Sequence, residues 1–335
     1  MSITIKRLAQ ELNLSVSTIS KALTDSHEIS AETKQRVTQL AQELNYKPNP
    51  YASSLRGRKS KTIAVVLPEI ADSFFSLAIN GIEEAASEKG YHVLIYLTHE
   101  SFLKEEAMLK DFQNGRVDGI LISVSRETSQ SDHIKEVMDR GIPVVFFDRI
   151  REDVATARIA TNDFESSYNA TMHLIEKGCK RLSFLCISKD LLISNSRMEG
   201  YKHALQDKQL ELHESSIVYC TNKAEENDAL IKDLLSGPQR PDGIIASVEK
   251  LTNPVYLACH ELQLRIPQDV KILSFSNLQT APLLNPALTT VTQPAFEMGK
   301  AAANLLLKCL LKKNAILGTE TEVLPSSLTI RQSTL

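Results

Sequence analysis

Three stretches at the start of the chain carry apolar residues at the spacing of a helix with one buried face: residues 4–12, 15–23 and 30–46. Thr4 and Ser15 stand where the N-caps of the first two helices belong. Asn13 tolerates the left-handed backbone of a tight turn, so only two or three residues need separate these helices. The pattern predicts an all-α domain over residues 1–48 that contains a helix-turn-helix.

Beyond residue 60, short apolar runs rich in β-formers alternate with amphipathic helical stretches. The apolar runs are KTIAVVL, YHVLIYL, VDGILIS, GIPVVFFD, KRLSFLCI, SSIVYC, PDGIIAS and DVKILSF. Continuously apolar strands joined by helices indicate parallel sheets covered on both faces. The pattern predicts an α/β core of two doubly wound lobes, with a ligand cleft at the carboxyl ends of the strands.

The second predicted helix has a short, polar outer face. Ser17, Thr18, Ser20 and Lys21 surround Ile19, its expected buried residue. Small hydrogen-bonding side chains let a helix lie deep in the major groove of DNA. A three-helix domain without DNA function remains an alternative on this pattern alone.

Residues 49–60 are predicted to form a hinge between the two parts. Pro50 suits the first turn of a short helix that is marginal by itself. Small residues such as Ala52 allow close approach to a second copy and to a minor groove, and Leu55 offers an apolar wedge between base steps. Arg56 supplies a phosphate contact. A flexible tether is the alternative.

Charge is distributed unevenly along the chain. The first sixty residues hold nine lysines and arginines against five acids, so the remainder carries a net charge of −7 within a total of −3. A basic end on an acidic body is expected where only that end meets a polyanion.

Other function classes lack their sequence signals. The chain has no GxGxxG after a strand, no GxxxxGK[ST], no HExxH and no GxSxG. Its five cysteines are an odd number without metal-binding spacing, so we expect buried or surface thiols, no metal site and no cofactor. With neither a secretory signal nor an apolar span of membrane length, the protein is expected to be cytoplasmic and not membrane-bound.

The segment TIKRLAQELNLSVSTISKALTDSHEISAETKQRVTQLAQELNYKPN, followed by ASSLR, resembles the DNA-binding headpiece and hinge of LacI/GalR family transcription regulators. The resemblance implies that Val16, Ser17 and Lys21 read bases in the major groove, and that Leu55 is a minor-groove lever. Arg7 departs from the family, which often has an acid there. The predicted DNA-binding residues are Thr4, Ser15, Val16, Ser17, Thr18, Lys21, Asn49, Ala52, Leu55 and Arg56.

The resemblance continues to the end of the chain through DSFFSLAINGIEEAA, GIPVVFFDR, RIPQDVKILSFSN and PALTTVTQPAFEMGKAA. It implies a periplasmic-binding-protein type I core with small-molecule effectors held between lobes that exchange chain more than once. The expected first lobe comprises about 61–160 and 292–320, and the second about 161–291 and 321–335. The helix from about Pro294 to Leu311 should return to the first lobe.

The effector residues follow from the same resemblance. Phe75, Asp148 and Arg197 match family positions, whereas Val248-Glu249 replaces the common Asn-Asp and Ser276-Asn277 replaces the common Asp-Asp, which argues against a plain hexose. Asp148 and Arg197 could instead form an ion pair, and Phe75 could simply pack in the core. The predicted effector-binding residues are Phe75, Asp148, Arg197, Glu249, Ser276 and Asn277.

The sequence therefore predicts a sequence-specific regulator, and the family resemblance implies a repressor of carbohydrate metabolism. It would bind a near-palindromic double-stranded DNA operator as a homodimer and respond to a small-molecule effector, a sugar or sugar derivative. Three alternatives stay open: control by a protein partner with the cleft as scaffold, a solute- or sugar-binding protein, and a sugar-processing enzyme.

Overall fold

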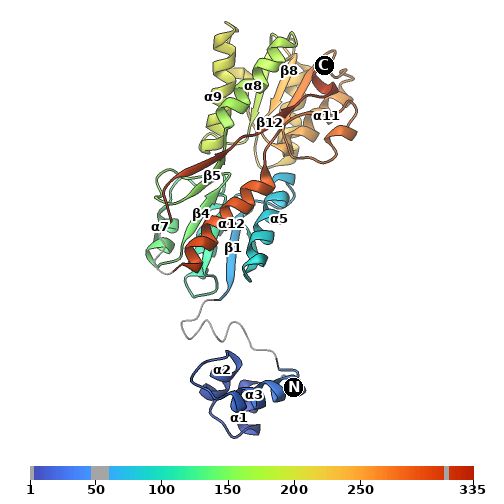
Figure 1. Ribbon diagram of the computed structural model, residues 1–335. Helices are drawn as coiled ribbons and strands as arrows, with labels where there is room; N and C mark the ends of the chain where they lie inside the picture. Colours follow the sequence, from blue (N-terminus) through green and yellow to red (C-terminus); the bar gives the residue numbers. More distant parts are fainter. Residues whose placement is uncertain (1–3, 47–59, 313–316) are drawn as a thin grey trace. The chain divides into compact units, whose positions relative to one another are not determined.

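A computed structural model describes residues 4–46, 60–312 and 317–335, and the chain divides into two compact units, residues 1–60 and 61–335 (Figure 1). The predicted hinge contacts Asn49, Ala52, Leu55 and Arg56 lie outside the described residues. None of the helices in these three described ranges is long and apolar enough to cross a membrane.

The first unit contains the three expected helices, α1 (Ile5–Glu11), α2 (Val16–Leu23) and α3 (Ala31–Glu43). Leu8, Ile19 and Val37, one from each helix, are fully buried together. Burying this shared apolar face stabilises helices that are each too short to be stable alone. The prediction of a three-helix domain with a helix-turn-helix is confirmed.

Local signals set the ends of these helices. Ser15 accepts a hydrogen bond of 3.0 Å from the backbone N–H of Thr18, and Ser30 accepts one of 3.3 Å from Thr33. Asn13 takes the expected left-handed conformation, with φ 52°. Thr4 occupies the N-cap position of α1, but its side chain makes no capping hydrogen bond there.

The first lobe of the second unit is a parallel six-stranded sheet of order β11-β5-β4-β3-β1-β2. Its strands are β1 (Thr62–Leu67), β2 (His92–Leu97), β3 (Gly119–Ile122), β4 (Val144–Phe147), β5 (Arg158–Thr161) and β11 (Thr321–Leu324). Its helices are α5 (Ser73–Glu88), α6 (Phe102–Phe112), α7 (Asp132–Asp139) and α12 (Ala295–Leu311).

The second lobe has the order β12-β10-β9-β8-β6-β7, and only β12 runs antiparallel. Its strands are β6 (Leu182–Cys186), β7 (Ile217–Tyr219), β8 (Gly243–Ala246), β9 (Lys271–Phe275), β10 (Thr289–Thr292) and β12 (Ser327–Thr329). Its helices are α8 (Asp163–Glu176), α9 (Leu192–Asp207), α10 (Ala224–Ser236) and α11 (Thr252–Glu261), with short 3-10 turns η1 (Glu214–Ser216), η2 (Glu249–Leu251), η3 (Ala281–Leu283) and η4 (Gln332–Thr334). The predicted pair of α/β lobes is confirmed.

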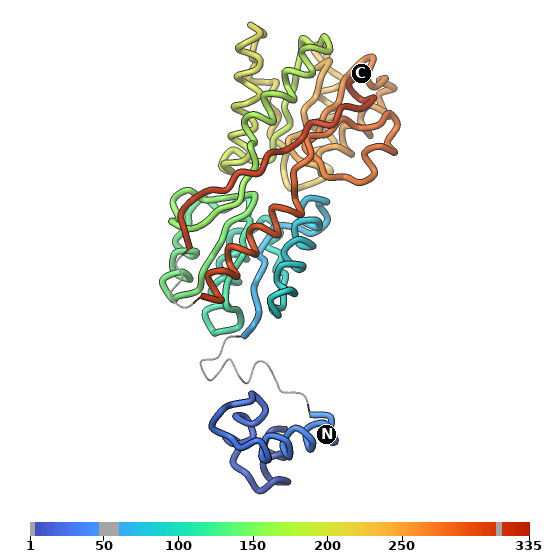
Figure 2. Tube along the Cα trace, in the orientation of Figure 1, coloured from blue at the N-terminus to red at the C-terminus, as the bar shows by residue number. Residues whose placement is uncertain are grey.

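The chain passes between the lobes three times, after β5, after β10 and after β11 (Figure 2). As expected, α12 returns to the first lobe, where it packs beside α5. The lobe boundary expected at about residue 320 falls slightly later in the structure. The first lobe continues through Leu324, because β11 hydrogen-bonds in parallel with β5 before the chain crosses for the last time.

Two glycines let α5 and α12 pack closely. A Cβ atom on Gly81 would lie 2.0 Å from the carbonyl oxygen of Phe296, and one on Gly299 would lie 2.0 Å from that of Ala78. A larger residue at either position would push the helices apart, because the backbone of α12 fills the space next to Gly81 and the backbone of α5 fills the space next to Gly299.

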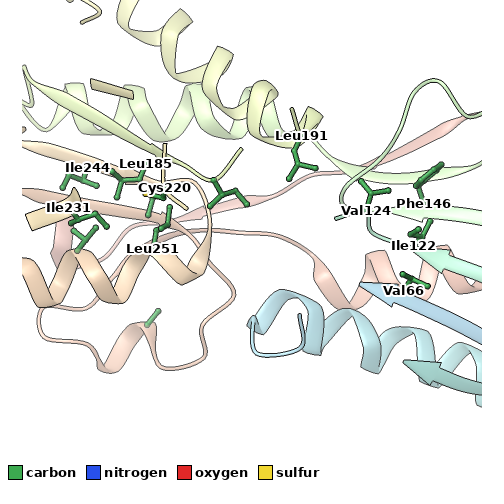
Figure 3. Close-up of a cluster of buried hydrophobic side chains, with 14 of the residues drawn as sticks. Val66, Ile122, Val124, Phe146, Leu185, Leu191, Cys220, Ile231, Ile244 and Leu251 are labelled. Carbon is green, nitrogen blue, oxygen red and sulfur yellow. The ribbon is translucent and has the colours of Figure 1, made fainter. Parts of the chain in front are cut away.

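One apolar cluster extends through both lobes (Figure 3). Val66, Ile122 and Phe146 belong to it in the first lobe and Leu185 and Ile244 in the second, with Val124 and Leu191 lying between them. All five cysteines are free thiols, as the sequence predicts. Four of them are buried in the second lobe, and Cys309 on α12 is partly buried.

Candidate functional site

The ends of the strands place a ring of polar side chains around one cavity between the two lobes. Its lining contains all six predicted effector residues and ten others. The complete lining is Asp72, Phe74, Phe75, Asp148, Arg149, Ile187, Ile193, Ser194, Arg197, Ser247, Val248, Glu249, Phe275, Ser276, Asn277 and Gln293. They come together because the carboxyl ends of parallel strands lie at one edge of each sheet, and the two edges face each other.

Arg197, on α9, is held rigidly at this cavity. Its Nε donates a hydrogen bond of 2.7 Å to Asp163, its Nη1 donates one of 2.6 Å to the carbonyl oxygen of Ser247, and its guanidinium lies 4.1 Å from the ring centre of Phe275. Its Nη2 is buried without a hydrogen-bond partner among the described residues. The arginine therefore presents one free nitrogen, with its N–H donors, in a fixed orientation.

Asp148 follows β4 and has a left-handed backbone, with φ 62°. Its Oδ1 accepts a hydrogen bond of 3.3 Å from Gln293, which follows β10, and its Oδ2 lies 4.0 Å from Nε of Arg149. The alternative of a direct Asp148–Arg197 ion pair is wrong, because Asp163 occupies the position beside Arg197.

Glu249 begins η2 in the second lobe and connects three backbone and side-chain donors. Its Oε1 accepts a hydrogen bond of 3.0 Å from the backbone N–H of Ser73, at the start of α5 in the first lobe. Its Oε2 accepts bonds of 2.7 Å from Ser276 Oγ and 2.9 Å from the backbone N–H of Asn277. One carboxylate thus joins both lobes across the cavity.

Phe75 has both of the roles that the sequence allowed. Only 2% of it is exposed, and it packs edge-on against Phe74 in the core of the first lobe. It also lines the cavity, where the guanidinium of Arg149 lies 5.8 Å from its ring centre. Arg149 is fixed by a buried ion pair of 2.7 Å with Glu100.

Burial and like charges perturb two carboxyl groups of the lining. Burial, together with the charges of Glu249 and Glu69, raises the pKa of Asp72 to about 7. Burial raises the pKa of Asp148 to about 6, although Arg149 acts in the opposite direction. Both carboxyl groups therefore lose their protons at a higher pH than an exposed aspartate does.

The cavity is small in this arrangement of the lobes. Its volume is about 30 Å³, which is room for roughly two or three water molecules. A ligand the size of a sugar needs the lobes to move apart before it enters.

Sequence reasoning missed several polar groups of this site. Asp72, Arg149 and Ser247 line the cavity, while Asp163 orients Arg197 and Gln293 contacts Asp148. Each lies within a few residues of a strand's carboxyl end. Considering every polar residue after a predicted strand would have found Asp72, Arg149 and Ser247, whereas β5 and β10, the strands before Asp163 and Gln293, were not among those predicted.

The headpiece offers a second candidate surface, on α2. Ser17 is exposed, and Val16, Ser20 and Lys21 are partly exposed. Ser15 and Thr18 bond to each other through their hydroxyl groups at 2.8 Å and fix the start of the helix. Lys21 forms an ion pair with Glu28.

Comparison with known proteins gives both units a family. Residues 4–49 match the model for bacterial regulatory proteins of the lacI family, and residues 171–334 match that for a periplasmic binding protein-like domain. The ribose operon repressor of Halalkalibacterium halodurans is 30% identical over 332 residues, which cover 99% of this chain and 97% of that protein.

Two solved structures share the fold. The lac repressor dimer bound to operator and the anti-inducer ONPF matches with a TM-score of 0.83 at 20% identity over 100% of both chains. A LacI family regulator from Enterococcus faecium with bound ribose matches with a TM-score of 0.72 at 25% identity, over 82% of this chain and 98% of that one. The ribose operon repressor and a second relative, the transcriptional repressor PurR of Vibrio atlanticus (28% identical over 313 residues), are repressors and not enzymes. This chain belongs to the LacI family of DNA-binding transcriptional repressors, with a helix-turn-helix headpiece and a periplasmic-binding-protein-like effector domain.

Proposed function

We propose that the protein is a cytoplasmic, homodimeric repressor that binds a near-palindromic operator and whose affinity depends on a small, sugar-related effector in the cleft between the lobes. One observation carries this proposal: the six residues predicted for effector binding line a single cavity, in a chain that also has a DNA-binding headpiece. The ribose operon repressor and the ribose-bound regulator support a carbohydrate-like effector.

The headpiece reads DNA through α2 in this proposal. Val16, Ser17 and Lys21 contact base edges, whereas Thr4, Ser15 and Thr18 contact phosphates near the helix starts. Asn49, Ala52, Leu55 and Arg56 act as the hinge, with Leu55 inserted in the minor groove. The likeness to the lac repressor dimer on its operator supports two headpieces on two half-sites.

The cleft controls the headpieces through the arrangement of the lobes. An effector shifts operator affinity only as far as it discriminates between the DNA-competent and incompetent arrangements. Glu249 is positioned to sense the effector, because its hydrogen bonds reach Ser73 in one lobe and Asn277 in the other. A marginal hinge helix would convert that change into altered DNA binding.

Selection of genomic fragments by the purified full-length protein tests this proposal. We expect enrichment of a short near-palindrome, and the genes beside it indicate effectors to titrate against operator binding. Equal binding to all fragments at moderate salt contradicts the proposal, since sequence-independent affinity comes from phosphate contacts alone.

The small cavity favours one other candidate, a regulator controlled by a protein partner with the cleft as scaffold. A volume of about 30 Å³ holds no sugar without movement of the lobes. Titration separates the two: under this alternative, no metabolite connected to the regulated genes changes operator binding, whereas a protein partner does.

A further inference from the structure

The cleft carries more negative than positive charge. Asp72, Asp148 and Glu249 line the cavity from both lobes, and the cations of the lining are Arg149 and Arg197. Each arginine already has a buried carboxylate as its close partner at 2.7 Å, Glu100 for Arg149 and Asp163 for Arg197. Five carboxylates therefore face two guanidinium groups. Nearby Lys250 lies 3.4 Å from Glu69 and 3.7 Å from Glu100, so with this pair included six carboxylates face three cations.

Two of these carboxylates lack a cation of their own. In the described part of the chain, neither Asp72 nor Glu249 takes part in an ion pair. Asp72 accepts a hydrogen bond of 2.8 Å from the backbone N–H of Phe74, and the bonds to Glu249 come from uncharged donors. Backbone and hydroxyl donors satisfy the oxygens but leave the two charges in place.

The lining also offers polar groups without partners. Arg197 Nη2 and Ser247 Oγ are buried and make no hydrogen bond within the described residues, and the two residues are 2% and 1% exposed. Buried polar atoms are costly unless something bonds to them. They point to a ligand oxygen that accepts from the arginine and bonds to the serine.

We propose that the effector is a hydroxylated primary amine of the amino-sugar type, with its ammonium group between Asp72, Asp148 and Glu249 and an oxygen on Arg197 and Ser247. This inference rests on the proposed function and names the ligand class of the same cleft. A neutral hydroxyl donates one hydrogen bond and leaves the negative charge of the ionised carboxylates in place, whereas an ammonium group donates three and neutralises one such charge.

The position of the carboxylates couples such a ligand to the lobes. Asp72 and Asp148 belong to the first lobe and Glu249 to the second, so a cation between them attracts both sides. The lobes must separate to admit the ligand, which breaks the hydrogen bond from the Ser73 N–H to Glu249. The ammonium group then donates to Glu249 in place of Ser73. The bound ligand therefore holds the two lobes together in place of the hydrogen bond between Ser73 and Glu249.

Calorimetry on the full-length protein at neutral pH tests the inference with matched probes. The amines are glucosamine, galactosamine and mannosamine, the neutral partners are glucose, galactose and mannose, and the acids are glucuronate and galacturonate. We expect at least one amine to bind about tenfold more tightly than its neutral partner, with the acids weakest. Ionic strength is matched with sodium chloride because amines are added as salts.

Substitutions connect the preference to the cleft. Asp72→Asn keeps an oxygen for the Phe74 N–H and removes the charge, so we expect the bound amine to lose about tenfold in affinity and its neutral partner less than about threefold. Asp132→Asn, at the exposed start of α7, is the matched control and should change neither.

The remaining outcomes overturn the inference. A neutral sugar or an acid that binds as tightly as its amine, or tighter, contradicts the charge argument while leaving an effector-controlled repressor intact. Absence of binding by every probe also overturns the amino-sugar assignment. The proposed function fails separately, when fragment selection finds no preferred DNA sequence.

Discussion

The backbone N–H of Ser73, in the first lobe, donates a hydrogen bond of 3.0 Å to Oε1 of Glu249, in the second. The other oxygen of the same carboxylate accepts hydrogen bonds from Ser276 and Asn277 within the second lobe. A single side chain is thus bonded on both sides of the cleft. Its removal loosens the closed arrangement without disturbing either sheet.

Glu249→Ala should make the lobes separate more readily. The change removes the acceptor of three hydrogen bonds, which we expect to cost about 1 to 2 kcal/mol of stability, because part of each lost bond is recovered from water. Hydrogen exchange should accelerate at the amides of Ser73 and Asn277. Glu225→Ala, in the exposed first turn of α10, is the control. Unchanged exchange at Ser73 contradicts this role of Glu249.

Stability should fall with rising pH through the titration of Asp72. Its pKa is about 7 in the folded protein against 3.8 ordinarily, so the native state holds the proton more tightly than the unfolded chain. The loss of folding stability from ionising Asp72 is absent below about pH 4, develops between about pH 4 and 7, and is complete above that range.

Asp72→Asn removes this pH-dependent cost and keeps a capping oxygen. Urea denaturation should find the variant more stable than the wild type by about 1 to 2 kcal/mol near pH 8, after allowance for partial solvent exposure, and equal to it near pH 4. Asp148, with its pKa raised to about 6, leaves a residual slope of the same sign. A difference that does not vary with pH contradicts this account.

If Lys21 contacts DNA as proposed, Glu28 competes with DNA for it. The two side chains, 42% and 51% exposed, form an ion pair that such a contact would have to break. Glu28→Gln should therefore strengthen operator binding about threefold at low salt, and Lys21→Ala should weaken it about tenfold. Glu43→Gln, at the end of α3, controls for the change in net charge.

A double variant isolates the pair. With Lys21→Ala in place, Glu28→Gln should have almost no effect on operator affinity measured by fluorescence anisotropy. If the gain persists in that background, Glu28 acts by direct repulsion from DNA and not through Lys21.

Exchange of Val16 and Ser17 should alter operator preference. Both residues lie at the start of α2, and Ser17 is exposed. Selection from a randomised operator library should return a changed consensus, with affinity for random DNA altered by less than about threefold. A uniform loss over all sequences would show that these side chains do not touch base edges.

Leu55→Ala should weaken operator binding and leave the dimer intact. A minor-groove wedge contributes only in the complex with DNA. Gel shifts on the selected operator and analytical ultracentrifugation of the free protein measure the two properties. Wild-type operator affinity in the variant would contradict insertion of the hinge.

Local pattern in the sequence determined the helices of the headpiece and eight strands of the two lobes, but not β5, β10, β11 and β12. Apolar spacing predicted the burial of Leu8 and Ile19, and Ser15 marks the start of α2, because caps and periodicity act over a few neighbouring residues. The family motifs placed Phe75, Asp148 and Arg197 at one cavity. These properties depend either on interactions between neighbouring residues or on positions that this sequence shares with the family motifs.

Only the tertiary structure decided how the charges are paired. Asp163, and not Asp148, is the partner of Arg197, and Glu249 bonds to Ser73 across 176 residues of chain. The last strand of the first lobe likewise pairs with β5 from far along the sequence. Such contacts follow from how two sheets bring distant strand ends to one edge, and no local periodicity encodes which of several carboxylates lies nearest to a given cation.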